Sequence, residues 1–102
     1  MVEPITAAGY YANERADIID GLPRPLGRVL DVGCGAGNVG VTARRAGAGR
    51  VVGVEVFPEA AARAEEVLDR VVTAPIEEAL DELTGERFDT VLCLDVLEHL
   101  AD

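Results

Sequence analysis

The sequence predicts an α/β protein built on an open parallel sheet with helices on both faces. Short apolar stretches typical of strands alternate with stretches of helical periodicity, in the order helix-β-α-β-α-β-α-β. The connections between them are short, which is typical of parallel sheets covered by helices. The stretch over residues 50–56 is almost purely valine, as expected of a strand that is buried on both faces.

The first half of the chain predicts a helix, a strand and a second helix. An amphipathic helix is expected over residues 8–22, and the prolines and glycines that follow it end it. A short apolar strand is expected over 28–32. A glycine-rich turn then leads into a helix over 38–46, which ends at the glycines of 47–49.

The second half predicts three more strands with two helices between them. After the strand over 50–56, a proline at a favourable first-turn position opens a helix over 58–68. A weaker strand over 70–73 is followed by an acidic helix or single turn over 76–83. A fourth apolar strand is expected over 88–94.

Length and composition limit the chain to one domain, 1–102, or part of one, because it has 102 residues. Its 49% apolar and 27% charged residues are typical of globular proteins. No apolar run approaches the length of a membrane span, and no basic stretch followed by an apolar core opens the chain. Two cysteines are too few for a disulfide scaffold and fit a reducing compartment, so we expect a cytoplasmic protein.

Charge is distributed unevenly along the chain. The net charge is −10, and residues 55–102 carry fourteen acidic side chains against three arginines. Such a surface repels phosphate backbones, so we expect no nucleic-acid partner. Every basic residue is arginine and none is lysine, which suggests a GC-rich bacterial genome.

The most informative segment is VLDVGCGAGNVG, over residues 29–40. A strand runs into glycines and then into a helix, so the backbone can approach a ligand where helix N–H groups point at it. The glycines at 35, 37 and 40 match the pattern G-x-G-x-x-G, and Glu55 lies twenty residues after Gly35. This spacing is that of a dinucleotide site, so a nicotinamide or flavin nucleotide remains an alternative.

Three features favour another nucleoside ligand. Asp31 stands two residues before the first glycine, where it suits a cationic amino or sulfonium group better than a pyrophosphate. That first glycine is Gly33, so the pattern reads D-x-G-x-G-x-G. Glu55 ends the second strand, where a carboxylate can accept both hydroxyls of a ribose.

Taken together, three segments resemble class I S-adenosylmethionine-dependent methyltransferases. They are DVGCGAG at 31–37, VVGVEVFPEAAARAEE at 51–66 and FDTVLCLDVLEHL at 88–100. The likeness is greatest to the broad bacterial type that includes ubiquinone-pathway O-methyltransferases. It implies a Rossmann-like sheet whose first four strands have the order 3-2-1-4, with S-adenosylmethionine as the cofactor.

The resemblance implies a role for each residue of the glycine loop. Gly33, Gly35 and Gly37 would wrap the methionine part of the cofactor. Cys34 would contribute its backbone there, while its thiol points into the core. Asp31 would be oriented towards the amino group of the cofactor.

The resemblance also implies contacts from outside this loop. Glu55 would hold the ribose hydroxyls, and Val56 and Phe57 would pack on the adenine. Tyr11 and Arg15 would close over the methionine carboxylate, with Arg15 as a charge-assisted donor.

One departure from the family pattern concerns the adenine. The third strand of the family is commonly followed by a Gly-Asp pair, whose Asp holds the adenine amino group. Here Ala74 and Pro75 stand in those places. Proline offers neither a carboxylate nor an N–H, so recognition would fall to the Ile76 backbone or to Glu77. We therefore expect weaker cofactor binding.

Near the end of the sequence, Asp95, Glu98 and His99 are spaced so that one side of a helix would gather them. The resemblance places Asp95 next to the sulfonium and the acceptor. His99 is a candidate general base on an acceptor hydroxyl. Capping of a helix start together with a surface histidine is the alternative, and no metal site is predicted.

The family's sheet has more strands than this sequence predicts, so the resemblance implies a truncated methyltransferase domain that holds the cofactor half. We expect the 102-residue chain to be inactive alone. A small-molecule methyl acceptor is favoured over a macromolecule. The alternatives are a fragment of a dinucleotide-dependent oxidoreductase and a non-catalytic nucleoside-binding or assembly module.

The strand over 88–94 would have an unpaired edge in the chain taken alone. Native proteins seldom leave such an edge bare. Pairing about a two-fold axis would join two copies into one continuous sheet, so the sequence predicts a homodimer through this edge.

Overall fold

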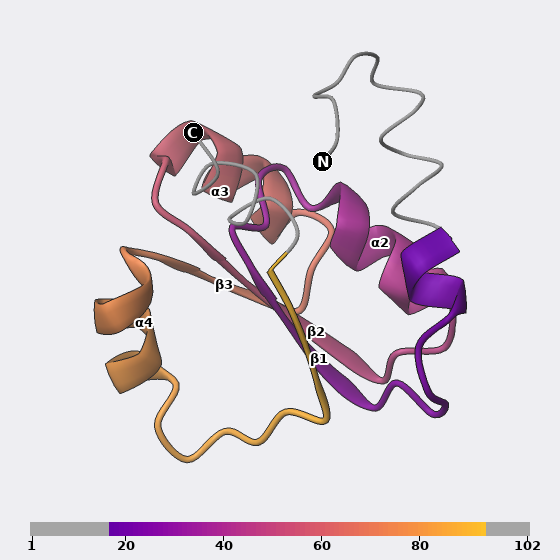
Figure 1. The fold of residues 1–102 in the computed structure, drawn as a ribbon. Coiled ribbons are helices and arrows are strands. Elements are labelled where there is room, and N and C mark those ends of the chain that lie inside the picture. The colour runs from indigo at the N-terminus through magenta and orange to yellow at the C-terminus, as the bar shows by residue number, and fades with distance from the viewer. Residues whose placement is uncertain (1–16, 94–102) are drawn as a thin grey trace, which may run out of the picture.

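The computed structural model describes residues 17–93, which form a four-stranded parallel sheet of order β3-β2-β1-β4 (Figure 1). The strands are β1 (Arg28–Val32), β2 (Arg50–Glu55), β3 (Arg70–Thr73) and β4 (Thr90–Leu92). The predicted fold class and strand order are confirmed.

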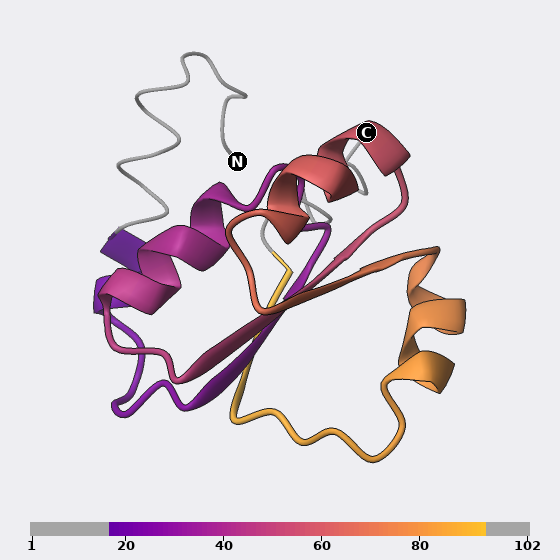
Figure 2. The same ribbon diagram turned by 180° about the vertical axis from the view of Figure 1, so that it is seen from behind.

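Helices cover both faces of this sheet, as predicted. They are α2 (Asn38–Arg45), α3 (Pro58–Glu65) and α4 (Ile76–Glu82). Figures 1 and 2 show α2 and α3 side by side on one face and α4 alone on the other. Residues 17–20 are also helical, and a turn follows at Gly21. The rest of the helix expected over 8–22 lies mostly outside the described residues.

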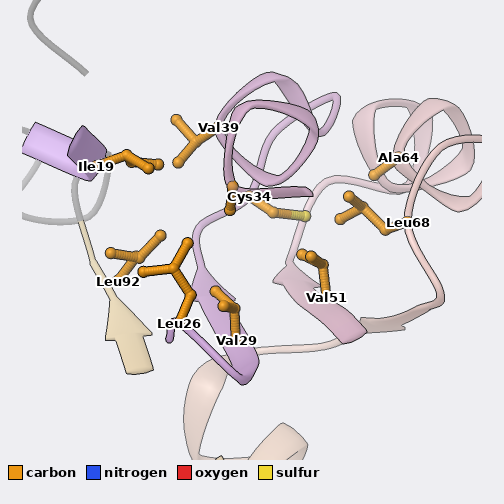
Figure 3. Packing of buried hydrophobic residues seen from close by; sticks show 10 residues of the cluster. Ile19, Leu26, Val29, Cys34, Val39, Val51, Ala64, Leu68 and Leu92 are labelled. Atoms are coloured by element: carbon orange, nitrogen blue, oxygen red, sulfur yellow. The ribbon is translucent and has the colours of Figure 1, made fainter. Parts of the chain in front are cut away.

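The apolar side chains divide into two clusters, one on each face of the sheet. Successive residues of a strand point to opposite faces, so Val51 joins the cluster under α2 and α3, and Val52 joins the one under α4. Figure 3 shows the first cluster, in which Leu68 and Ala64 pack against Val51. The valine-rich character of β2 therefore reflects burial on both faces.

Most element boundaries lie within a residue of the prediction, and two differ more. The expected strand over 88–94 is shorter, because the Asp89 carboxylate accepts the Arg28 N–H at 2.9 Å, where a strand neighbour would otherwise bond. Leu94 lies outside the described residues. Helix α3 ends at Glu65 instead of Leu68, because the N–H groups of Glu66 and Val67 bond to carbonyls only three residues back. Among the described residues, no helix is long and apolar enough to cross a membrane.

An ion-pair cluster closes the amino-terminal edge of the sheet. Arg28, Arg50 and Arg70 are the first residues of β1, β2 and β3. The Glu86 carboxylate accepts hydrogen bonds from Arg50 Nε at 2.7 Å, Arg70 Nη1 at 3.0 Å and Arg28 Nη2 at 3.3 Å. The Glu86 side chain is 11% exposed. Chiefly because Arg50 donates to it, the pKa of Glu86 lies below its usual value.

We expect Glu86→Gln to lower the free energy of unfolding by about 1–3 kcal/mol near neutral pH, because a neutral amide replaces the carboxylate that the arginines share. The pKa of Glu86 is lower in the folded chain than its usual 4.5. Its contribution is therefore complete above that value and is lost as the pH falls through the folded-state pKa. Urea unfolding at a series of pH values should show the two proteins converging in acid.

Glu82→Gln is the matched control, since Glu82 is exposed and forms no ion pair among residues 17–93. Equal stability of the Glu86 and Glu82 variants at neutral pH would show that the cluster contributes nothing.

Candidate functional site

A cleft of about 460 Å³ opens at the carboxyl edge of the sheet, where ligands of parallel α/β proteins bind. The ends of β1 and β2, the start of α3 and the segment between β3 and α4 form its walls. It is lined by Val32, Gly33, Gly35, Val54, Glu55, Val56, Phe57, Ala60, Ala74, Pro75 and Ile76.

The glycine loop between β1 and α2 forms one side of the cleft. Gly33 and Gly35 have φ values of 76° and 56°, in the left-handed region that side chains disfavour. The N–H groups of Gly33 and Cys34 both donate to the Val54 carbonyl, at 2.8 and 3.0 Å. The loop is therefore bound to the end of β2 through its backbone.

Glycines outside the cleft let the layers behind the loop approach closely. A Cβ on Gly53 would lie 2.5 Å from the Cys34 sulfur, and a Cβ on Gly37 would lie 2.8 Å from a methyl of Val67. Gly37 therefore brings the start of α2 against the residues that end α3. Cys34 is buried with its thiol in the first core cluster, as predicted (Figure 3).

Glu55 is the one charged side chain among the described residues that line the cleft. Its side chain is largely buried, since the residue is 7% exposed. Oε1 accepts the Gly35 N–H at 2.8 Å, and Oε2 accepts the Phe57 N–H at 3.1 Å. Each carboxylate oxygen has a second lone pair, so Glu55 can hold the loop and still accept hydroxyl donors from a ligand.

The opposite wall of the cleft is apolar. Val56 is 49% exposed and Phe57 is 66% exposed, although both side chains are large and hydrophobic. Ala60, Pro75 and Ile76 continue this surface. Exposed apolar side chains beside a cleft favour binding of a flat, weakly polar ring.

Seven of the predicted site residues line this cleft together: Gly33, Gly35, Glu55, Val56, Phe57, Pro75 and Ile76. Asp31, Cys34 and Gly37 do not line it. Asp31 is buried in the middle of the sheet at 2% exposure, between Gly53 of β2 and Leu92 of β4.

Four predicted residues, Tyr11, Arg15, Asp95 and His99, lie outside the described residues. Within residues 17–93, no group of three or more His, Cys, Asp or Glu side chains is placed to hold a metal ion.

The sequence analysis did not identify Val32, Val54, Ala60 and Ala74, which also line the cleft. For Val32, Val54 and Ala74 the position at, near or just after a strand end was a usable signal, because the carboxyl ends of parallel strands meet at one edge. Ala60 comes from the first turn of α3 instead, and only the packing of that helix brings it to the cleft.

The arrangement can bind a ligand that carries a diol next to a flat ring. A carboxylate faces the cleft between backbone N–H groups and an apolar wall. Such a site offers acceptors to hydroxyls and apolar contact to an aromatic base, which are the two parts of a nucleoside.

Comparison with known proteins gives one consistent result. Residues 7–102 match a family described as methyltransferase domain. A ubiquinone biosynthesis O-methyltransferase from Neisseria meningitidis is 37% identical over an alignment of 95 residues, and the match covers 86% of this chain and 40% of that protein. The chain thus spans well under half the length of this relative. No match supports the dinucleotide-dependent alternative.

Solved structures share the fold. A SAM-dependent methyltransferase from Archaeoglobus fulgidus has a TM-score of 0.68 at 24% identity and covers 83% of this chain and 37% of its own. A SAM-bound amino pentose methyltransferase from Micromonospora echinaspora has a TM-score of 0.57 at 25% identity and covers 91% of this chain and 44% of its own.

We expect Glu55→Ala to expose the N–H groups of Gly35 and Phe57, which both donate to its carboxylate. Hydrogen bonds to a charged group contribute about 1.5–3 kcal/mol, so these two amides should exchange with solvent at least about tenfold faster. Amide exchange followed by NMR measures this.

Glu59→Ala, in the exposed first turn of α3, is the control and should change neither amide. Unchanged exchange at Gly35 and Phe57 in the Glu55 variant would contradict the role of Glu55 in holding the loop.

Proposed function

The chain belongs to the class I S-adenosylmethionine-dependent methyltransferase family, and from this premise we propose that its cleft binds S-adenosylmethionine as the cofactor half of a methyltransferase. The observation that carries the proposal is the Glu55 carboxylate, which faces the cleft between the glycine loop and an apolar wall. This combination of a carboxylate acceptor and an apolar wall fits the cofactor, because a nucleoside presents a diol and a flat base together.

In this proposal each side of the cleft holds one part of the cofactor. Glu55 accepts hydrogen bonds from the ribose hydroxyls. Val56 and Phe57 pack on the adenine, and their exposed side chains leave that surface open to it. Gly33 and Gly35 bring the loop backbone next to the methionine part. Their positive φ values shape the loop, and other residues would adopt them only with strain.

The residues behind the cleft support it indirectly. Gly37 and Cys34 pack the glycine loop against α3 and β2. Asp31 is buried in the middle of the sheet, and its role towards the cofactor's amino group stays a prediction. The roles of Tyr11 and Arg15 at the methionine carboxylate, and of Asp95 near the sulfonium, also stay predictions.

For the complete enzyme we propose methyl transfer to a hydroxyl of a small molecule. The bound cofactor supplies an electrophilic methyl group on a sulfonium. Glu55 and the glycine loop would hold the cofactor, and its methyl group would pass to the acceptor oxygen while the sulfur leaves as a neutral thioether. His99 takes the hydroxyl proton. The protein's contribution is mainly to orient the two reactants. The relatives named as O-methyltransferases support an oxygen acceptor.

We also propose that the protein is cytoplasmic and that its substrate is not a nucleic acid. The chain has only two cysteines, which fits the reducing cytoplasm. Its net charge of −10 disfavours a nucleic-acid substrate.

We expect the 102-residue chain to bind S-adenosylhomocysteine more tightly than NAD in calorimetry. Loss of two charge-assisted hydrogen bonds in Glu55→Ala should weaken the binding by about 2–4 kcal/mol. Glu59→Ala, four residues away on an exposed helix turn, should bind normally. Tighter binding of NAD would refute the proposed cofactor. An affinity of the Glu55 variant within twofold of that of the parent chain would show that Glu55 does not bind the ribose.

We also propose that the 102-residue chain pairs with a second copy through β4. Within residues 17–93, β4 bonds only to β1, and Val91 on it is 56% exposed. Sedimentation at micromolar concentration should show a dimer, and Val91→Lys should give a monomer because charge guards a strand edge. Thr73→Lys, on the opposite edge strand β3, should remain dimeric. A single 10.7 kDa species for the parent chain would rule the dimer out.

A further inference from the structure

We propose that the cleft recognises the purine of the cofactor by apolar contact, with no side-chain acceptor from residues 17–93 for its exocyclic amino group, so that it tolerates a purine without that group. This inference rests on the proposed function and concerns the specificity of the same site. It predicts a cofactor site that selects strongly for the ribose and weakly for the base.

The first observation is the chemistry of the side chains in the cleft. Of the described residues that line it, Glu55 alone has a polar side chain, and the others are aliphatic, aromatic, proline or glycine. Both oxygens of Glu55 are already held by the N–H groups of Gly35 and Phe57. The one side-chain acceptor among the described lining residues is thus bound to the glycine loop, where we propose that the ribose lies.

The second observation is the segment that follows β3. Pro75 lines the cleft next to Ala74 and Ile76, and all three side chains are apolar. The Pro75 carbonyl accepts the Ala79 N–H at 2.9 Å within α4. This segment therefore presents apolar carbon to the cleft, and the acidic residues of α4 at 77 and 78 are exposed outside its lining.

Exposure of the apolar wall decides how the rim of the base is solvated. Phe57 is 66% exposed and Val56 is 49% exposed, so a ring packed on them keeps an edge near water. An amino group at that edge can remain hydrated, and so can the carbonyl oxygen that replaces it in hypoxanthine. Adenine and hypoxanthine then bury similar apolar area against the protein, and the polar substituent in which they differ stays hydrated in both.

The size of the expected effect follows from the kind of contact. Sites that hydrogen-bond a polar substituent can reject an analogue lacking it by about 10⁴–10⁵-fold, because a buried partner is left unpaired. Apolar contact alone discriminates far less. We therefore expect S-adenosylhomocysteine and S-inosylhomocysteine to bind with dissociation constants within about tenfold of each other.

Calorimetric titration of the full chain with these two ligands tests the inference. A preference for the adenosine compound of more than about tenfold would overturn it while leaving the proposed function in place. If neither ligand binds, the proposed function itself fails. Glu77→Ala should leave both affinities unchanged, and a selective loss of the adenosine compound in this variant would overturn the inference by identifying a side-chain acceptor.

Pro75→Asp provides the complementary variant, because it adds a carboxylate to the apolar segment. The substitution removes no backbone donor, and Asp is a favoured residue at the start of a helix. The variant should prefer the adenosine compound by at least about tenfold more than the parent chain does. Pro75→Ala is its control and should keep the parent's ratio. An unchanged ratio in Pro75→Asp would overturn the placement of the base against this segment.

Discussion

The side chain of Glu55 accepts the N–H groups of Gly35 and Phe57, and these two hydrogen bonds join the segments on either side of the cleft. One segment is the glycine loop after β1, and the other leads from β2 into α3. The same loop is bound a second time, through the Val54 carbonyl. Backbone groups that would otherwise face the cleft without partners are thus satisfied by the neighbouring strand end. The shape of the ligand site depends on this connection.

The amino and carboxyl ends of the strands differ in the partners that their charged side chains have. At the amino edge, arginines at the starts of β1, β2 and β3 converge on Glu86, which leaves its pKa low and its carboxylate occupied. At the carboxyl edge one glutamate holds only backbone N–H groups and retains lone pairs for a ligand. Among the described residues, a compact ionic cluster thus lies at the amino ends of the strands, and a cleft with one charged side chain lies at their carboxyl ends.

Glycines behind the cleft allow the elements next to it to pack closely. Gly53 lies under Cys34, and Gly37 lies against Val67, so α2, α3 and β2 pack with little space between them. Ala60 in the first turn of α3 and Phe57 just before that helix line the cleft. The glycine loop and the apolar wall thus form two sides of the cleft in which we propose that the cofactor binds.

The helices on both faces, the glycine loop and the position of Glu55 followed from the sequence, because alternating periodicity and glycine spacing are local properties of the chain. The strand order was implied by the family resemblance. Tertiary structure alone decided which of these residues face the cleft. Asp31 is buried in the sheet instead of lining the cleft, since strands pair on both sides of it. In the sequence nothing distinguishes Glu86 from the other acidic residues. Only the register of the strands gathers the arginines at the starts of β1, β2 and β3 around it. Such contacts join residues far apart in the sequence, so no local pattern records them.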